Sequence, residues 1–231
     1  MRTFTTNYKL RRAVINYFDG TENADDIGTW DTSQITDMSD IFEHIQQISS
    51  EPIVLNWNTS NVTNMSYMFY YCTQNFILNF DTSNVTNMSY MFYRATNFNQ
   101  PLHFNTSQVT NMSFMFYDAA SFNQPLLFNT SQVTNMSFMF YNATSFNQPL
   151  HFDTSNVTTM SYIFESATSF NQPLHFNTSK VTNMSNMFHK ATSFNQPLYF
   201  NTYNITNLYI KLLLYYILHN INAELPILID L

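Results

Sequence analysis

The sequence predicts an α/β solenoid, a stack of coils in which each repeat of about 24 residues contributes a short parallel β-strand and one short helical turn. The first observation is a repeated pair of Asp-Thr or Asn-Thr, each preceded by an aromatic anchor: Trp30, Trp57, Phe80, Phe104, Phe128, Phe152, Phe176 and Phe200. The anchors are spaced by 27, 23 and then 24 residues. A fixed period in the twenties is typical of proteins whose units contact mainly their neighbours. The second observation is composition, because 17% aromatic and 10% charged residues favour a packed core over disorder.

The chain begins with a helical pattern, ahead of the first anchor. Apolar residues recur there with the spacing of one helix face: Leu10, Ala13, Val14, Tyr17 and Phe18. We therefore expect residues 1–29 to form an N-terminal helical cap on the first coil. We expect residues 30–207 to form the solenoid of seven to eight repeats, and residues 208–231 to form a decayed repeat and a C-terminal cap.

Within a repeat, the apolar period changes from that of a strand to that of a helix. Leu150 and Phe152 alternate with His151, which predicts a short strand. A separate stretch of the repeat places apolar residues at i, i+3, i+4 and i+7, which predicts a helix of about two turns: Met136, Met139, Phe140 and Ala143. Because so short a helix is unstable alone, it depends on packing against its neighbours.

Two asparagine columns mark the corners of the coils. The chain has only 2 glycines, so we expect asparagine to supply the left-handed backbone that corners require. The first column comprises Asn99, Asn123, Asn147, Asn171 and Asn195, and the second comprises Asn64, Asn87, Asn111, Asn135 and Asn183. Stacked carboxamides are also expected to form hydrogen bonds from coil to coil.

The repeat decays at the C-terminal end. Leu208 and Leu212 occupy core positions, but Lys211 stands where earlier repeats have a methionine. We expect residues 208–231 to fold over the last coil, because an uncovered coil exposes apolar core and open strand edges. The alternative is an imperfect cap that leaves a surface for end-to-end self-association.

Charge and cysteine content exclude several classes of function. A net charge of -7, without a basic run, argues against nucleic acid or an anionic membrane as the partner. Cys72 is the only cysteine, so an internal disulfide is excluded. No secretory signal is visible, and Lys211 and His219 interrupt the apolar C-terminal stretch, so no membrane span is expected. The compartment stays unknown, and an intracellular or virion-associated place is expected over export.

The sequence motifs of the repeat resemble those of a known family. The stretches IGTWDTSQITDMSDIF, WNTSNVTNMSYMFYYC and FNQPLHFNTSQVTNMSFMFYNA are similar to repeats of the BspA-like leucine-rich-repeat surface proteins, in particular their mycoplasma lipoprotein-type branch. The resemblance covers roughly residues 9–208. It implies a leucine-rich-repeat-like, right-handed coil stack and a role in adhesion or protein binding, often at a cell surface. The near absence of glycine and the replacement of core leucine by Phe and Met depart from that pattern.

No catalytic, cofactor-binding or metal-binding residue is predicted. A column of exposed strand positions holds three histidines, His103, His151 and His175, but two adjacent imidazoles are too few ligands for a structural zinc site. Aspartates at Asp31, Asp81 and Asp153 never fall in adjacent coils, which suits turns better than calcium binding. The repeated serines are copies of one turn residue, whereas a catalytic site needs a unique constellation of different groups.

An aromatic stripe is the candidate interaction surface. On the outer side of the predicted helical turn, two neighbouring columns carry Tyr67, Tyr90, Phe114, Phe138 and Tyr162, and Tyr70, Tyr93, Tyr117 and Tyr141. If exposed, these rings form an apolar patch larger than is usual on a monomer, and tyrosine is favoured at interfaces. The alternative is that they stack on one another and only shield the core.

Two functions therefore stay open. The first is a non-enzymatic repeat protein that binds an unidentified protein partner, with adhesion or host interaction implied by the family resemblance alone. The alternative is a structural component that self-assembles, either end to end through the C-terminal cap or laterally through the aromatic stripe.

Overall fold

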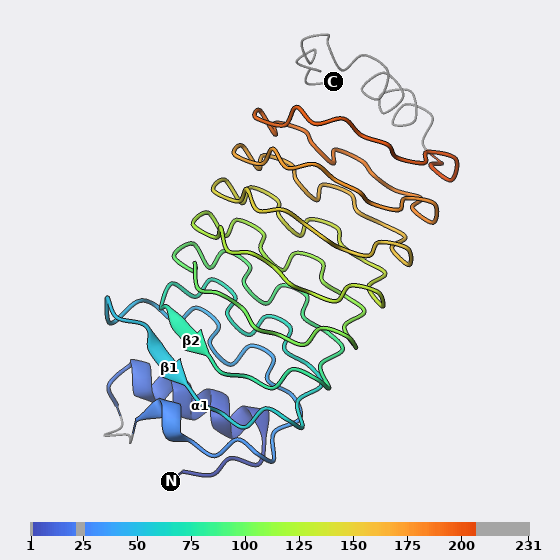
Figure 1. Ribbon diagram of the computed structural model, residues 1–231. Coiled ribbons are helices and arrows are strands. Elements are labelled where there is room, and N and C mark those ends of the chain that lie inside the picture. Colours follow the sequence, from blue (N-terminus) through green and yellow to red (C-terminus); the bar gives the residue numbers. More distant parts are fainter. Residues whose placement is uncertain (1, 22–25, 207–231) are drawn as a thin grey trace.

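The computed structural model describes residues 2–21 and 26–206, which form a row of coils lying one above another (Figure 1). Isolated parallel bridges join equivalent residues of successive coils, from Asp37 and Asn64 at one end to Thr159 and Asn183 at the other. The bridged residues are 27, 23 and then 24 positions apart, the same spacing as the aromatic anchors. Each repeat therefore contributes one coil. The expected cap over residues 208–231 lies outside the described residues.

The helix α1 (Asn7–Phe18) lies across the N-terminal end of the stack (Figure 1). The side chain of Thr6 caps it by accepting a hydrogen bond from the amide of Lys9. Leu10, Ala13 and Val14 are buried beneath it. Phe18 reaches the rings of the first coils, with its centroid 6.4 Å from that of Phe42. The helix covers apolar core that would otherwise be exposed to water.

Strands are shorter and fewer than the repeat predicts. Among the described residues, β1 (Ile53–Leu55) and β2 (Phe76–Leu78) are the only strands, and they pair in parallel with Ile53 opposite Phe76. A short 3-10 helix, η1 (Ile27–Thr29), precedes them. Later coils enter the equivalent segment through Pro101, Pro125, Pro149, Pro173 and Pro197, which have no amide hydrogen to donate. The prediction of a strand in every coil is therefore wrong for these coils, although Leu150 and Phe152 point inward and His151 is exposed, as expected.

The predicted helical turn is also wrong, and two consecutive tight turns take its place. The amides of Met139 and Ala143 each bond to the carbonyl three residues earlier, at 3.3 and 3.1 Å. Phe138 and Asn142 hold left-handed backbone, with φ of 60 and 51°, which no α-helix contains. The amides of Phe138 and Phe140 bond instead to carbonyls of the next coil, both at 2.9 Å. Two turns four residues apart place the inward side chains at the same spacing as a helix face, which explains the misleading pattern.

The asparagine columns have a different role from the one predicted. None of the ten asparagines named above has left-handed backbone, so that prediction is wrong. Asn135 instead accepts a hydrogen bond from the amide of Ser137, which shapes the turn. The first column does link successive coils, but through the backbone: the backbone amide of Asn147 donates to Asn123 Oδ1, and that of Asn171 donates to Asn147 Oδ1, both at 2.9 Å. The side-chain amide that donates to Asn123 Oδ1 belongs to Gln148, at 3.1 Å.

The core is a set of continuous columns between the two walls of the coils. One column of stacked phenylalanines runs through Phe42, Phe69, Phe92, Phe116, Phe140, Phe164 and Phe188, with neighbouring centroids 5.1–5.7 Å apart. Buried threonines add polar bonds between coils; Thr130 Oγ1, for example, donates to the carbonyl of Asp153 at 2.9 Å. Repetition of these contacts aligns the outward side chains of successive coils in columns as well.

Candidate functional site

The nine aromatic residues predicted as an interaction surface lie together on the turn side of the coils. We call them the aromatic ladder, with an outer column (Tyr67, Tyr90, Phe114, Phe138 and Tyr162) and an inner column (Tyr70, Tyr93, Tyr117 and Tyr141). Every outer-column residue has left-handed backbone, with φ of 59–60°. This conformation turns the side chain outward, while the amide hydrogen still reaches the next coil. The tight turn thus positions the ladder.

The rings of each column stack almost parallel. Neighbouring centroids in the outer column are 4.3–4.5 Å apart with planes within 9° of each other. In the inner column the separations are 4.4–4.9 Å, with planes within 17°. The two columns also touch, because Tyr90 and Tyr93 have centroids 5.6 Å apart and tilted planes. The structure thus brings the nine residues together in two adjoining columns.

Stacking covers the faces of the rings and leaves their edges outward. All nine side chains are half-buried, so none is a fully exposed aromatic residue. Seven of the nine are tyrosines, whose phenol ends in a hydroxyl group. The surface that water meets therefore consists of ring edges and tyrosine hydroxyls, which combine apolar area with hydrogen-bonding groups.

Polar residues end both columns. At the N-terminal side, the equivalent positions are Asp40 and Glu43, and at the C-terminal side they are Asn186 and Glu165. Asp40 and Asn186 share the left-handed backbone of the outer column, with φ of 60 and 53°. Glu165 is buried and pairs with His189 at 3.0 Å, while its Oε2 has no partner among the described residues. The ladder is thus a bounded patch.

A polar network beside the inner column was not predicted. Arg94 donates to Asp118 at 2.8 Å and to the hydroxyl of Tyr71 at 2.6 Å, and its guanidinium lies 5.1 Å from the ring of Tyr71. Asn142 adds a bond to Asp118 at 2.7 Å. These residues occupy one column, four positions after the outer column. That fixed offset is the signal in the sequence that would have found them.

Burial changes the acidity of the ladder. Burial of the phenol is the largest cause, and the nearby Tyr67 is the second; together they raise the pKa of Tyr90 from 10.0 to about 12. Burial is also the main cause of the raised pKa of Tyr70, Tyr93 and Tyr117. These four phenols are therefore neutral at physiological pH.

The other features named from the sequence lie apart from the ladder. The column of His103, Leu127, His151, His175 and Tyr199 is exposed on the strand side, with Leu127 at 85%. In the part of the chain that the structure describes, no three side chains of His, Cys, Asp or Glu gather closely enough to hold a metal ion.

The aspartates named as turn residues have that role. Asp31, Asp81 and Asp153 each accept a hydrogen bond from the backbone amide two residues later. Hydrogen bonds from the serine at that position lower the pKa of each aspartate, with the serine side chain as the largest cause at Asp81 and the backbone amide at the other two. Cys72 is buried, and burial raises the pKa of its thiol to about 12, which favours an unreactive thiol.

The described ranges contain no helix long and apolar enough to cross a bilayer.

No curated protein and no solved structure gives a significant match to the chain. One family model does match, described as "Mycoplasma protein of unknown function, DUF285", over residues 12–127, 73–152 and 126–216. These three overlapping matches together extend from residue 12 to residue 216. The chain is therefore a repeat protein that belongs to the DUF285 family.

Proposed function

We propose that this DUF285 protein is a non-enzymatic solenoid of the leucine-rich-repeat-like, right-handed kind, which binds another protein through its aromatic ladder. The observation that carries the proposal is the ladder itself, an unbroken double column of nine rings bounded by polar residues. The non-enzymatic part rests on repetition, since the outward polar groups are copies of turn residues rather than a unique catalytic constellation.

The energetics of the outer column support a role beyond stability. Left-handed backbone costs an L-residue other than glycine roughly 1–2 kcal/mol, while each aromatic pair contributes about 0.5–1.5 kcal/mol beyond its buried area. Stacking therefore offsets the strain without clearly exceeding it. Asp40 and Asn186 occupy the same backbone position, so the coil does not require an aromatic residue there. Binding to a partner gives a reason why five consecutive coils carry an aromatic residue at this position of the outer column.

The exposed chemistry indicates the kind of partner. Ring edges and hydroxyls suit a protein surface that offers apolar side chains together with hydrogen-bond acceptors. Tyrosine contributes to such interfaces with large contact area and little conformational entropy to lose. Adhesion or host interaction is the biological setting that the BspA-like resemblance suggests for this binding.

The test is a capture experiment with two matched triple variants of the full chain. The first, Tyr93→Ser/Tyr117→Ser/Tyr141→Ser, removes most of the inner column. The control replaces three exposed residues of the strand side with serine: His103→Ser/His151→Ser/His175→Ser. Circular dichroism first establishes that both variants are folded at the assay temperature. We expect partners captured by the wild type to be lost with the ladder variant and retained with the control, whereas equal recovery by all three proteins contradicts the proposal.

The alternative, lateral self-assembly, uses the same surface and makes a different prediction. Size-exclusion chromatography with light scattering should give a concentration-independent monomer if the ladder serves a foreign partner. Concentration-dependent oligomers that the ladder variant abolishes would instead assign the surface to a second copy of this chain.

A further inference from the structure

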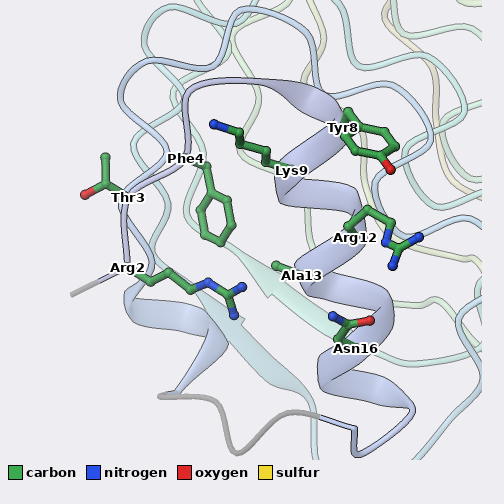
Figure 2. Close-up of a pocket in the computed structure, with 8 residues that line it drawn as sticks. All are labelled: Arg2, Thr3, Phe4, Tyr8, Lys9, Arg12, Ala13 and Asn16. Atoms are coloured by element: carbon green, nitrogen blue, oxygen red, sulfur yellow. The ribbon is translucent and has the colours of Figure 1, made fainter.

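The pocket between the N-terminal segment and α1 has a volume of about 490 Å³, and its lining includes Arg2, Lys9 and Arg12. Figure 2 shows that these side chains do not converge, because Arg12 extends away from the side on which Arg2 and Lys9 lie. Arg2 also lies over the rings of Phe4 and Trp30, 5.2 and 5.5 Å from their centroids. The pocket therefore gives a ligand no common focus. The aromatic ladder does, because its nine rings lie in two adjoining columns.

The aromatic ladder is a long and narrow strip. Its outer column crosses five coils in steps of 4.3–4.5 Å between ring centroids, so it is about 18 Å long. It is two rings wide, because the two columns lie 5.4–6.0 Å apart within a coil. Polar side chains lie on both flanks of the strip along the coils: Asn87, Asn111 and Asn135 before the outer column, and Arg94, Asp118 and Asn142 after the inner column. A globular partner covers a broad patch of about 800 Å², whereas a strip of this shape matches a single extended segment.

The spacing of the rings discriminates between conformations of such a segment. Two steps of the inner column span about 9 Å, since neighbouring centroids are 4.4–4.9 Å apart. A polyproline II helix rises about 3.1 Å per residue, and therefore about 9.3 Å per turn of three residues. A β-strand repeats the same face every ~6.6–6.8 Å and an α-helix completes a turn every ~5.4 Å, which match neither one step nor two. A polyproline II segment along the stack therefore repeats its contacts at every second coil.

The chemistry of the strip agrees with this conformation. The nine side chains are uncharged, and the edges of aromatic rings carry the positive part of their quadrupole. A polyproline II segment has no internal hydrogen bonds, so its carbonyl oxygens are available to tyrosine hydroxyls and ring edges. Proline has a fixed φ and therefore loses little conformational entropy on binding. Aromatic side chains recognise proline-rich segments in several classes of peptide-binding domain for these reasons.

We propose that the aromatic ladder binds a proline-rich segment of its partner in the polyproline II conformation, aligned with the stack of coils. This inference rests on the proposed function, because it names the kind of segment that the protein-binding surface takes. About six residues of the segment cover the outer column, at about 3.1 Å per residue. The hydroxyls of Tyr93, Tyr117 and Tyr141 donate to carbonyl oxygens of the segment, and its proline rings lie against the ring edges of the outer column.

Fluorescence anisotropy with labelled peptides tests this inference on the full chain. The probe is a peptide of nine prolines, and the control is a flexible peptide of nine alternating glycines and serines. We expect the proline peptide to bind at least tenfold more tightly than the control. A peptide of three prolines should bind at least tenfold more weakly than the peptide of nine. Absence of binding by the nine prolines, or equal affinity for any two of these peptides, overturns the inference.

Two triple variants locate the contact. Tyr93→Phe/Tyr117→Phe/Tyr141→Phe keeps every stacked ring of the inner column and removes only three hydroxyls, so its circular dichroism should match that of the wild type. It should bind the nine prolines at least fivefold more weakly. His103→Ser/His151→Ser/His175→Ser, on the strand side, should bind them as the wild type does. Unchanged affinity of the phenylalanine variant, or equal weakening by both variants, overturns the assignment.

Competition separates this inference from the proposed function. A protein that the wild type captures and the Tyr93/Tyr117/Tyr141 triple serine variant does not is challenged with a saturating concentration of the nine-proline peptide. We expect the peptide to displace the captured protein. Retention of that protein overturns the proline-rich assignment while the ladder stays the binding surface. Equal capture by the wild type and the serine variant instead contradicts the proposed function, and this inference with it.

Discussion

Phe140 provides the most direct prediction about the core. Its side chain is fully buried, and its ring lies 5.7 Å from Phe116, 5.6 Å from Phe164 and 4.2 Å from Phe146. Phe140→Ala removes this ring from a continuous column and leaves a cavity that the coils above and below can only partly close. Such a truncation costs about 3–5 kcal/mol of unfolding free energy. At about 2–4 °C per kcal/mol for a chain of this length, the Tm should fall by about 6–20 °C.

Phe138→Ala is the matched control, because it removes the same side chain two residues earlier. Phe138 is half-buried in the outer column and has stacked neighbours on two sides, Phe114 and Tyr162. We expect its loss to cost about 1–2 kcal/mol, mostly in aromatic contact. Urea unfolding and thermal unfolding, both followed by circular dichroism, measure the two variants. If the Phe138 variant is destabilised as much as the Phe140 variant, the assignment of inward and outward positions in the turn is wrong.

Two further predictions concern the bonds between coils and the titration of the ladder. Thr130→Val keeps the shape of a buried side chain but removes its hydrogen bond to the Asp153 carbonyl, so the free energy of unfolding should fall by about 1–3 kcal/mol. An unchanged free energy of unfolding, measured in urea, would show that this bond contributes nothing. Because the pKa of Tyr90 is about 12 in the folded chain and 10.0 is its ordinary value, the neutral phenol stabilises the fold below pH 10. This stabilisation should be lost as pH rises from about 10 to about 12. The phenolate absorbance of the wild type minus that of Tyr90→Phe follows this titration, and a midpoint near pH 10 in that difference would contradict the prediction.

The turn of each coil shows most clearly how far the fold could be predicted from the sequence. Met136, Met139, Phe140 and Ala143 are all buried, as their spacing predicts, yet they do not form a helix. Apolar spacing reports which side chains face inward, and two tight turns place them as one helix face does. It does not report whether an amide bonds within its own coil or to the next one.

The left-handed residues are hidden from sequence reasoning for a related reason. Asparagine tolerates this backbone best among residues other than glycine, so it was the natural candidate. Other residue types hold most of these positions, for example Tyr90 and Arg94, whose amides each bond to a carbonyl of the next coil; among the described residues only Asn142 and Asn186 are left-handed asparagines. The hydrogen bond that offsets the backbone strain forms only between stacked coils, so the sequence of a single repeat does not show it.

The ladder itself could be predicted, since equivalent positions of successive repeats must form columns. The network around Arg94 and Asp118 was missed, because composition does not show which unlike residues meet in adjacent coils, whereas their shared offset of four positions from the outer column does. The bounds of the ladder follow from the sequence as well, where Glu165 and Asn186 replace aromatic residues.

The central claim is that the aromatic ladder is the binding surface, and the affinity of one captured protein partner tests it most directly. That partner is titrated against the wild type, the Tyr93/Tyr117/Tyr141 triple serine variant and the His103/His151/His175 triple serine variant. Fewer than about 30% of interface residues cost more than 1 kcal/mol on truncation, and tyrosine is enriched among them, so we expect at least one of the three tyrosines to do so and the ladder variant to bind at least about fivefold more weakly. The histidine variant should match the wild type, and equal affinities for all three proteins would contradict the claim.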